Sequence, residues 1–264
     1  MFKDFSKDLF DIIILAGQSN AEGWALGEVD RPYTPTSLVW CINNDSRVSG
    51  EFTITVAKER VVKNEVVSNF GLIFAEEYIK NGRLAEKRKV LIVNAAVGNT
   101  GFVDGHWGMN DDLYLRMLDM IDTAISLNPE NRIVAFLWHQ GEKEVGNASY
   151  DIHYDRLLSL VQSVRNRYDL PELPFIAGDF SHEWADTKEG ACVPIVNAIR
   201  DVCVACTNAG FVETDGLQSN WQCLNRMCWE PNAYKDIIHF SRPSIYELGR
   251  RYFRVYVGIE EKCK

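Results

Sequence analysis

The sequence lacks an excess of positive charge, and this absence excludes a large class of partners. Its 264 residues include 37 acidic and 28 basic side chains, which leave a formal net charge of −9. A surface that is acidic on average repels the phosphate backbone of nucleic acids and the headgroups of anionic lipids. We therefore expect no nucleic acid and no membrane among the partners of this protein.

Long apolar runs are missing as well. The uninterrupted run near the N-terminus, Ile12 to Ala16, is too short for the apolar region of a signal peptide or for a membrane span. No repeat, low-complexity tract or Pro/Gly/Ser-rich linker divides the chain, whose length suits one large core. The sequence predicts a single domain over residues 1–264, located in the cytoplasm, and leaves its oligomeric state open.

Cysteines are present, but not in the pattern of a disulfide framework. The seven cysteines are an odd number spread over a large chain, which is typical of reduced thiols. Cys203 and Cys206 with Cys223 and Cys228 have the residue type of a zinc site. However, four residues separate the second pair and the first pair lies in a helical pattern, so we expect helix packing and no metal. A local disulfide between Cys223 and Cys228 stays open for oxidising conditions.

Short apolar segments alternate with longer segments of helical periodicity. The expected strands are Asp11–Ala16, Leu38–Ile42, Lys89–Asn94, Arg132–Trp138, Pro174–Ala177 and Gly210–Glu213. The expected helices are Asn69–Asn81, Asp111–Leu127, Ser149–Tyr168, Val193–Thr207 and Ser244–Tyr256. This alternation predicts an α/β fold with a parallel sheet. The alternating segment Glu51–Val62 predicts an extra hairpin at the sheet edge.

The loops that follow the strands carry most of the polar residues of interest. Three of these loops are Gly17–Asn20, Ala95–Gly101 and His139–Glu142, and a fourth, Thr214–His239, is unusually long. In an open parallel sheet the loops after the carboxyl ends of the strands gather along one edge, where ligands bind. We therefore expect these four loops to form one site.

The residues in these loops suit acyl transfer from an ester. Ser19 supplies a hydroxyl nucleophile, and a neutral imidazole such as that of His239 takes the hydroxyl proton during attack. Asp236, three residues before His239, is placed to hold the other ring nitrogen. Donors for the developing oxyanion are the backbone N–H of Ser19, the backbone of Gly98 and the side-chain amide of Gln140.

Four ordered motifs carry a resemblance to a known superfamily. They are Gly17-Gln18-Ser19-Asn20, Gly98-Asn99-Thr100-Gly101-Phe102, Trp138-His139-Gln140-Gly141-Glu142 and Asp236-x-x-His239. Together they resemble the four blocks of the SGNH hydrolases, and within them the sialate O-acetylesterase-like carbohydrate esterases of family 6 type. The resemblance extends from residue 11 to about residue 256.

This resemblance implies a three-layer α/β/α sandwich of flavodoxin-like type with a central parallel sheet and no cofactor or metal. It implies hydrolysis of O-acetyl esters on sialic acid or a polysaccharide through an acetyl-serine intermediate. By position, Ser19, Asp236 and His239 form the catalytic triad, and Ser19, Gly98 and Gln140 form the oxyanion hole. The sequence departs from the family at Asn99, where the usual Gly-Gly-Thr has its second glycine.

Other residues of these loops are candidates for substrate binding or for support of the triad. They are Gln18, Asn20, Asn99, Thr100, Glu142, Trp221 and Trp229. The two tryptophans are candidates because an aromatic face suits the apolar face of a sugar, whereas we expect Trp138 to lie in the core.

Two alternative functions stay open at this point. One is a carbohydrate-binding protein that has kept the esterase fold without activity, and the other is a lipid or thioester hydrolase of the same superfamily. Labelling by a fluorophosphonate probe, which needs an activated serine, separates the first from an enzyme. A preference for longer acyl chains identifies the second.

Overall fold

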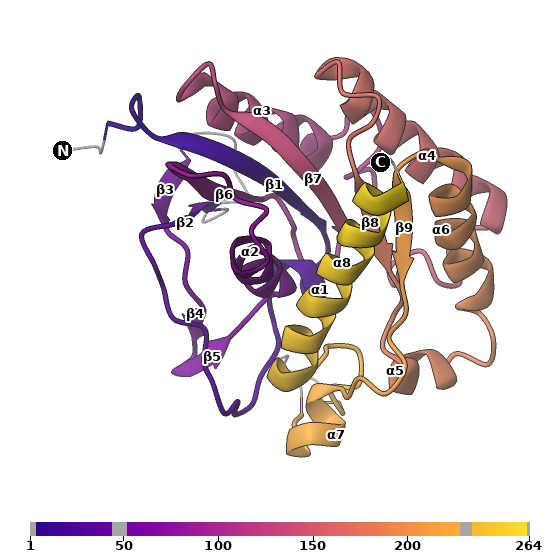
Figure 1. Cartoon of the computed structure of the whole chain (residues 1–264). Coiled ribbons are helices and arrows are strands. Elements are labelled where there is room, and N and C mark those ends of the chain that lie inside the picture. Colours follow the sequence, from indigo (N-terminus) through magenta and orange to yellow (C-terminus); the bar gives the residue numbers. More distant parts are fainter. Residues whose placement is uncertain (1–3, 44–51, 228–233, 263–264) are drawn as a thin grey trace.

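A seven-stranded sheet forms the centre of the molecule (Figure 1). The computed structural model describes residues 4–43, 52–227 and 234–262. The strand order is β3-β2-β6-β1-β7-β8-β9, and every neighbouring pair is parallel except β2 and β3. The strands are β1 (Leu9–Gly17), β2 (Val39–Asn43), β3 (Thr53–Val56), β6 (Arg88–Asn94), β7 (Arg132–His139), β8 (Phe175–Gly178) and β9 (Ala209–Val212).

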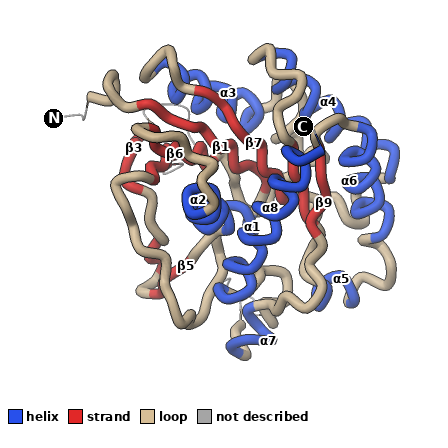
Figure 2. The backbone as a smooth tube through the Cα atoms, viewed as in Figure 1, coloured by secondary structure: helices blue, strands red, loops and turns tan. Residues whose placement is uncertain are grey.

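Helices cover both faces of the sheet, which gives three layers (Figure 2). α3 (Asp112–Ser126), α4 (Tyr150–Arg167) and α6 (Val193–Ala205) pack on one face, and α2 (Phe70–Lys80) and α8 (Arg242–Lys262) pack on the other. The central strand β1 is apolar without alternation because both of its faces are buried. Ile12 and Ile14 belong to the first core and Ile13 and Leu15 to the second. The predicted three-layer α/β/α sandwich is confirmed, and the expected parallel sheet has one antiparallel edge strand, β3.

The strand order explains where the candidate loops meet. The run β6-β1-β7-β8-β9 has the flavodoxin-like order, and β2 and β3 extend it at one edge. β6 and β7 therefore lie on opposite sides of β1, with Asn94 opposite Leu15 and His139 opposite Gly17. The loops that follow these three strands consequently start side by side.

The predicted hairpin over Glu51–Val62 is wrong in its pairing. β3 joins the main sheet as an antiparallel edge strand, whereas β4 (Arg60–Val62) pairs with β5 (Glu65–Val67) in a separate two-stranded sheet. The turn between β4 and β5 consists of Lys63 and Asn64, which have φ angles of 49° and 67°. Positive φ at both central residues is the conformation of a tight hairpin turn, and it is reached here without glycine. Glu51 itself lies outside the described residues.

Three short helices were not expected from the sequence. They are α1 (Ser19–Glu22), α5 (His182–Asp186) and α7 (Asn220–Leu224). α7 divides the long Thr214–His239 loop and begins with a capping box between Ser219 and Gln222. That loop is therefore partly regular rather than one extended connection.

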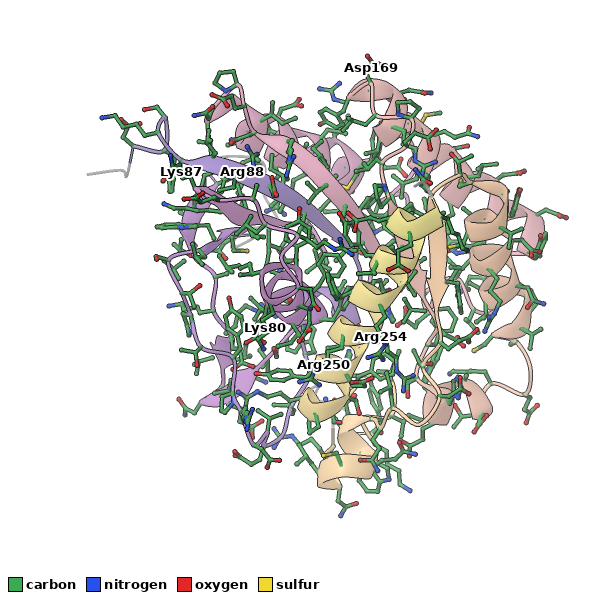
Figure 3. All side chains as sticks on the ribbon, in the orientation of Figure 1. Lys80, Lys87, Arg88, Asp169, Arg250 and Arg254 are labelled. Carbon is green, nitrogen blue, oxygen red and sulfur yellow. The ribbon has the colours of Figure 1, made fainter. Side chains whose placement is uncertain are left out.

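An ion-pair network joins β1, β6 and β7 at the end where these strands begin. The buried carboxylate of Asp11 accepts hydrogen bonds from Arg88 at 2.6 Å, from Arg132 at 2.7 and 3.0 Å, and from the Tyr78 hydroxyl at 2.9 Å. Burial raises the pKa of Asp11, but these partners outweigh it and hold the pKa below its usual value. Arg88 is the first residue of β6 (Figure 3), so the network lies at the opposite end of the sheet from the candidate loops.

Among the helices of the described ranges, none combines the length and the apolar content that crossing a membrane requires.

Candidate active site

A cavity of about 490 Å³ opens at the carboxyl ends of the central strands. Its lining includes four of the residues that the sequence singled out for chemistry, namely Ser19, Gly98, Asp236 and His239. Gln18 and Asn99 also line it. Two of the three loops and the long segment before α8 thus line one cavity. The third loop, His139–Glu142, contributes no lining residue and contacts the site through the hydrogen bond between Glu142 and Asn20.

Ser19 follows a point where β1 and β7 pack very closely. A Cβ atom on Gly17 would lie 2.1 Å from the backbone oxygen of His139, and Gly17 has a φ of 125°, so only glycine fits there. The N–H of Gln18 donates to that same oxygen at 2.9 Å. Ser19 then begins α1, and its backbone N–H has no partner in the described part of the chain. This N–H is free to bind an anionic oxygen.

His239 and Asp236 form a hydrogen-bonded pair at the edge of the cavity. Nδ1 of His239 lies 2.8 Å from Oδ1 of Asp236, and Oδ2 of Asp236 accepts a hydrogen bond from Asn220 at 2.8 Å. Burial raises the pKa of Asp236, but the hydrogen bonds and charge of His239 and the bond from Asn220 outweigh it and lower the pKa. The ionised carboxylate only accepts, so it assigns the ring proton to Nδ1 and leaves Nε2 as an acceptor.

Ser19 and His239 line the same cavity without a direct hydrogen bond between them in the described structure. Catalytic hydrogen bonds are often long in a site without substrate and shorten when the substrate binds.

Asn20 ties the serine segment to the histidine segment. Its side-chain amide donates to the backbone oxygen of Ile238 at 3.1 Å and to Glu142 at 3.0 Å, and its oxygen accepts from the N–H of Phe240 at 3.1 Å. The backbone on both sides of His239 is therefore held relative to α1. Burial raises the pKa of Glu142, and its second oxygen has no partner in the described structure. The structure thus places Asn20 and Glu142 behind the cavity, where they support the histidine loop.

The backbone N–H of Gly98 has an internal partner. It donates to Oε2 of Glu22 at 2.7 Å, and a Cβ atom on Gly98 would lie 2.8 Å from that oxygen and 3.5 Å from Cβ of Ser19. The glycine thus lets the loop backbone approach Ser19. The next residue, Asn99, has a φ of 59°, a left-handed conformation that asparagine tolerates. This explains how the loop accommodates asparagine in place of the family's second glycine.

Gln140 and Thr100 lie deeper than the sequence interpretation assumed. Gln140 is fully buried and is absent from the cavity lining, and its amide donates to Oε1 of Glu144 at 2.8 Å. The Thr100 hydroxyl donates to the backbone oxygen of Val97 at 2.6 Å and accepts from Trp107 at 3.0 Å. Both side chains brace the loops in this structure. The role of Gln140 as an oxyanion donor stays a prediction.

The tryptophan at the cavity is not one of those that the sequence favoured. Trp221 is absent from the lining and carries Lys235 over its ring at 4.7 Å, and Trp229 lies outside the described residues. Trp24 lines the cavity instead and stacks on His239, with ring centroids 6.4 Å apart. The sequence could have indicated Trp24 as a cavity residue, because it follows the Gly-Gln-Ser-Asn motif closely. Trp138 is fully buried, as expected.

The outer wall of the cavity comes from outside the main sheet. Val62 and Lys63 of the β4–β5 hairpin line it together with Met227 and Tyr234 from the long segment before His239. An ion pair of 2.9 Å between Arg226 and Glu65 joins the two segments. The two segments of the wall are therefore in direct contact.

The cysteines are placed as packing residues where the structure describes them. Cys203 is buried on α6, and Cys206 follows the end of that helix. No group of three or more His, Cys, Asp or Glu side chains within residues 4–43, 52–227 and 234–262 is arranged to hold a metal ion. The open alternative of a disulfide with Cys223 involves Cys228, which lies outside the described residues.

A family comparison matches nearly the whole chain. The family model described as "Carbohydrate esterase, sialic acid-specific acetylesterase" matches residues 9–258. A search among curated protein sequences finds no significant match.

Solved structures with the same fold come from several sources. The crystal structure of NanS has a TM-score of 0.77 and 17% sequence identity, and the match covers 97% of this chain and 99% of that one. A protein from Arabidopsis thaliana has a TM-score of 0.68 and 18% identity, with 94% and 98% covered. A carbohydrate acetylesterase from Xanthomonas citri has a TM-score of 0.60 and 14% identity, with 94% of this chain and 56% of that one covered. At these identities the likeness shows the fold.

Proposed function

The chain belongs to the carbohydrate esterase family of sialic acid-specific acetylesterases and is a carboxylic ester hydrolase; from this premise we propose that Ser19, His239 and Asp236 remove O-acetyl groups from a carbohydrate. One observation carries the assignment of residues. Ser19 and the pair Asp236 and His239 come from two segments far apart in the sequence and line one cavity, and the carboxylate of Asp236 lies 2.8 Å from Nδ1 of His239.

In the acylation step, Oγ of Ser19 attacks the carbonyl carbon of the acetyl group. Nε2 of His239 takes the hydroxyl proton, and the carbonyl electron pair moves onto oxygen to give a tetrahedral oxyanion. When the carbon–oxygen bond to the sugar breaks, the sugar oxygen receives this proton from His239. Acetyl-serine remains, and the deacetylated sugar leaves.

In the deacylation step, water attacks the acetyl-serine carbonyl and gives its proton to His239. The second tetrahedral intermediate collapses, Oγ of Ser19 recovers the proton, and acetic acid leaves. In both steps the oxyanion needs donors, for which we propose the free N–H of Ser19 and the N–H of Gly98.

The substrate class is proposed from the family and from the cavity. The acetyl group enters beside Ser19 and Gly98, and the sugar lies toward the aromatic and apolar part of the lining that Trp24, Met227 and Tyr234 form. An aromatic and apolar wall suits the apolar face of a pyranose ring. O-acetylated sialic acid is the first candidate, and an acetylated polysaccharide is the second.

Acetate release tests this proposal. Wild type and Ser19→Ala are compared on p-nitrophenyl acetate, O-acetylated sialic acid and acetylated xylan. We expect turnover by the wild type and its loss in the variant, with the fold intact by circular dichroism. A variant that keeps a near wild-type rate contradicts the assignment of Ser19.

If the wild type hydrolyses none of these esters, labelling of Ser19 by a fluorophosphonate probe is the next measurement. Failure of a fluorophosphonate probe to label Ser19 then supports the binding-protein alternative, and labelling supports an ester outside the panel.

A further inference from the structure

The carboxylate of Glu22 occupies a position next to the proposed nucleophile. Its Oε2 accepts from the Gly98 N–H at 2.7 Å and from Nε1 of Trp24 at 2.9 Å, while Oε1 lies 3.9 Å from Arg60. The Glu22 side chain is 18% exposed and lines the cavity together with Ser19. A negative charge therefore stands at the place where an acyl oxygen would bind.

This arrangement conflicts with an unhindered oxyanion hole. A charge-assisted hydrogen bond is about twice as strong as a neutral one, so the carboxylate holds the Gly98 N–H against a neutral ester carbonyl. It also repels any negative charge that forms beside it. The proposed chemistry thus requires that Glu22 release the Gly98 N–H when the ester binds, and Arg60 and Trp24 remain as its partners.

We infer that Glu22 is a specificity-determining residue of the acyl pocket: every acyl oxygen has to displace its carboxylate from the Gly98 N–H, and an anionic ligand is in addition repelled by its charge. This inference rests on the proposed function. Acetic acid, the product of deacylation, loses its proton at neutral pH, and acetate would need the same N–H that Glu22 holds. Return of Glu22 to Gly98 therefore displaces the product and keeps acetate from inhibiting the enzyme.

The test compares inhibition by acetate with inhibition by acetamide, a neutral ligand of nearly the same shape. In Glu22→Gln the charge is absent while the side-chain size is kept. We expect the inhibition constant of acetate to fall by about tenfold or more, because the repulsion between two unit charges about 4 Å apart exceeds its value in bulk water at a partly exposed site. The inhibition constant of acetamide falls less, because acetamide gains only from the weaker hold of a neutral amide on the Gly98 N–H and carries no charge for Glu22 to repel. A residue that only braces the loop would shift both constants by the same factor.

A matched variant controls for the change in net charge. Glu189→Gln removes one acidic charge from an exposed residue that does not line the cavity, and it should move neither constant. An acetate constant that is the same in Glu22→Gln and wild type overturns the inference. A large loss of kcat/KM in folded Glu22→Gln also overturns it, because Glu22 would then be needed to build the site.

A second variant applies if Glu22→Gln does not fold. Arg60→Gln removes the cation that holds Glu22 after it leaves Gly98, so we expect KM for p-nitrophenyl acetate to rise while kcat changes less. An unchanged KM contradicts the inference. The comparison of wild type with Ser19→Ala does not involve Glu22. It therefore distinguishes a failure of the proposed function from a failure of the inference on Glu22.

Discussion

Replacement of Asp236 by asparagine should reverse the proton arrangement of His239. In the wild type, one carboxylate oxygen faces Nδ1 of His239 at 2.8 Å and the other accepts from the amide of Asn220 at 2.8 Å. In Asp236→Asn, the Asn220 amide still donates, so it selects the oxygen of the new side chain. The new NH₂ group then points at Nδ1, which must accept, and the ring proton moves to Nε2.

A proton on Nε2 prevents His239 from taking the proton of Ser19. The expected loss in kcat is about 10³ to 10⁴, which corresponds to roughly 4 to 5.5 kcal/mol of transition-state stabilisation. Ser19→Ala should cost more, because that change removes the nucleophile itself. The measurement is steady-state turnover of p-nitrophenyl acetate, with circular dichroism as the check on folding.

The orientation argument also predicts a rescue. When Asn220→Asp is added to Asp236→Asn, the introduced carboxylate only accepts, so it turns the neighbouring amide and returns an oxygen to His239. We expect the double variant to recover about tenfold of the lost rate. Recovery stays partial because the Asn220 amide also donates to the backbone oxygen of Trp24 at 3.1 Å. A double variant no faster than Asp236→Asn would refute the tautomer reasoning, and so would an Asp236→Asn rate near that of wild type.

Two further predictions concern the loop at the cavity and the far end of the sheet. Gly98→Ala places a methyl group 2.8 Å from Glu22 Oε2, so kcat/KM should fall by about tenfold or more, whereas Gly258→Ala on α8 meets open space and should leave kinetics unchanged. Asp11→Asn leaves two arginines without their buried partner and should reduce the free energy of unfolding by about 3 kcal/mol at pH 7 in urea titrations. Because the folded-state pKa of Asp11 is depressed, its contribution is present above the unfolded value of about 3.9 and is lost as the pH falls below it. The difference between Asp11→Asn and wild type should therefore shrink on acidification; a constant difference contradicts this reasoning.

The layered fold was predictable because the patterns that indicate its strands and helices are local in the sequence. The run Ile12–Ala16 marked the central strand, and the structure extends it only to Leu9–Gly17. α8 begins at Arg242 and continues to Lys262, beyond the expected Ser244–Tyr256, because Pro243 suits a first helical turn and Gly258 does not end the helix. The pairing of β4 was missed because Lys63 and Asn64 adopt positive φ without a glycine to signal the turn.

The candidate site was predictable only where motifs follow strands. Ser19 and Gly98 lie in the loops that follow β1 and β6, so the topology brought them together. Glu22 carried no signal in the sequence, since its partner Gly98 lies 76 residues away and the pairing depends on the exact path of two loops. The hydrogen bond from Gln140 to Glu144 was not predicted for a similar reason, because the burial of Gln140 depends on how the surrounding loops pack. The single-domain organisation and the cytoplasmic location stay predictions.

The β4–β5 hairpin has a consequence for how substrate range can change in such an enzyme. The reacting groups stand on loops anchored to the central sheet, whereas Val62 and Lys63 at the outer wall stand on a separate two-stranded sheet clasped by Arg226 and Glu65. If the proposed function holds, side-chain changes at Val62 and Lys63 should alter which ester is accepted, whereas Arg226 has to keep its place because its backbone oxygen accepts from the N–H of Asp236 at 3.0 Å. The scaffold therefore places one part of the cavity wall on an element that carries none of the proposed reacting groups.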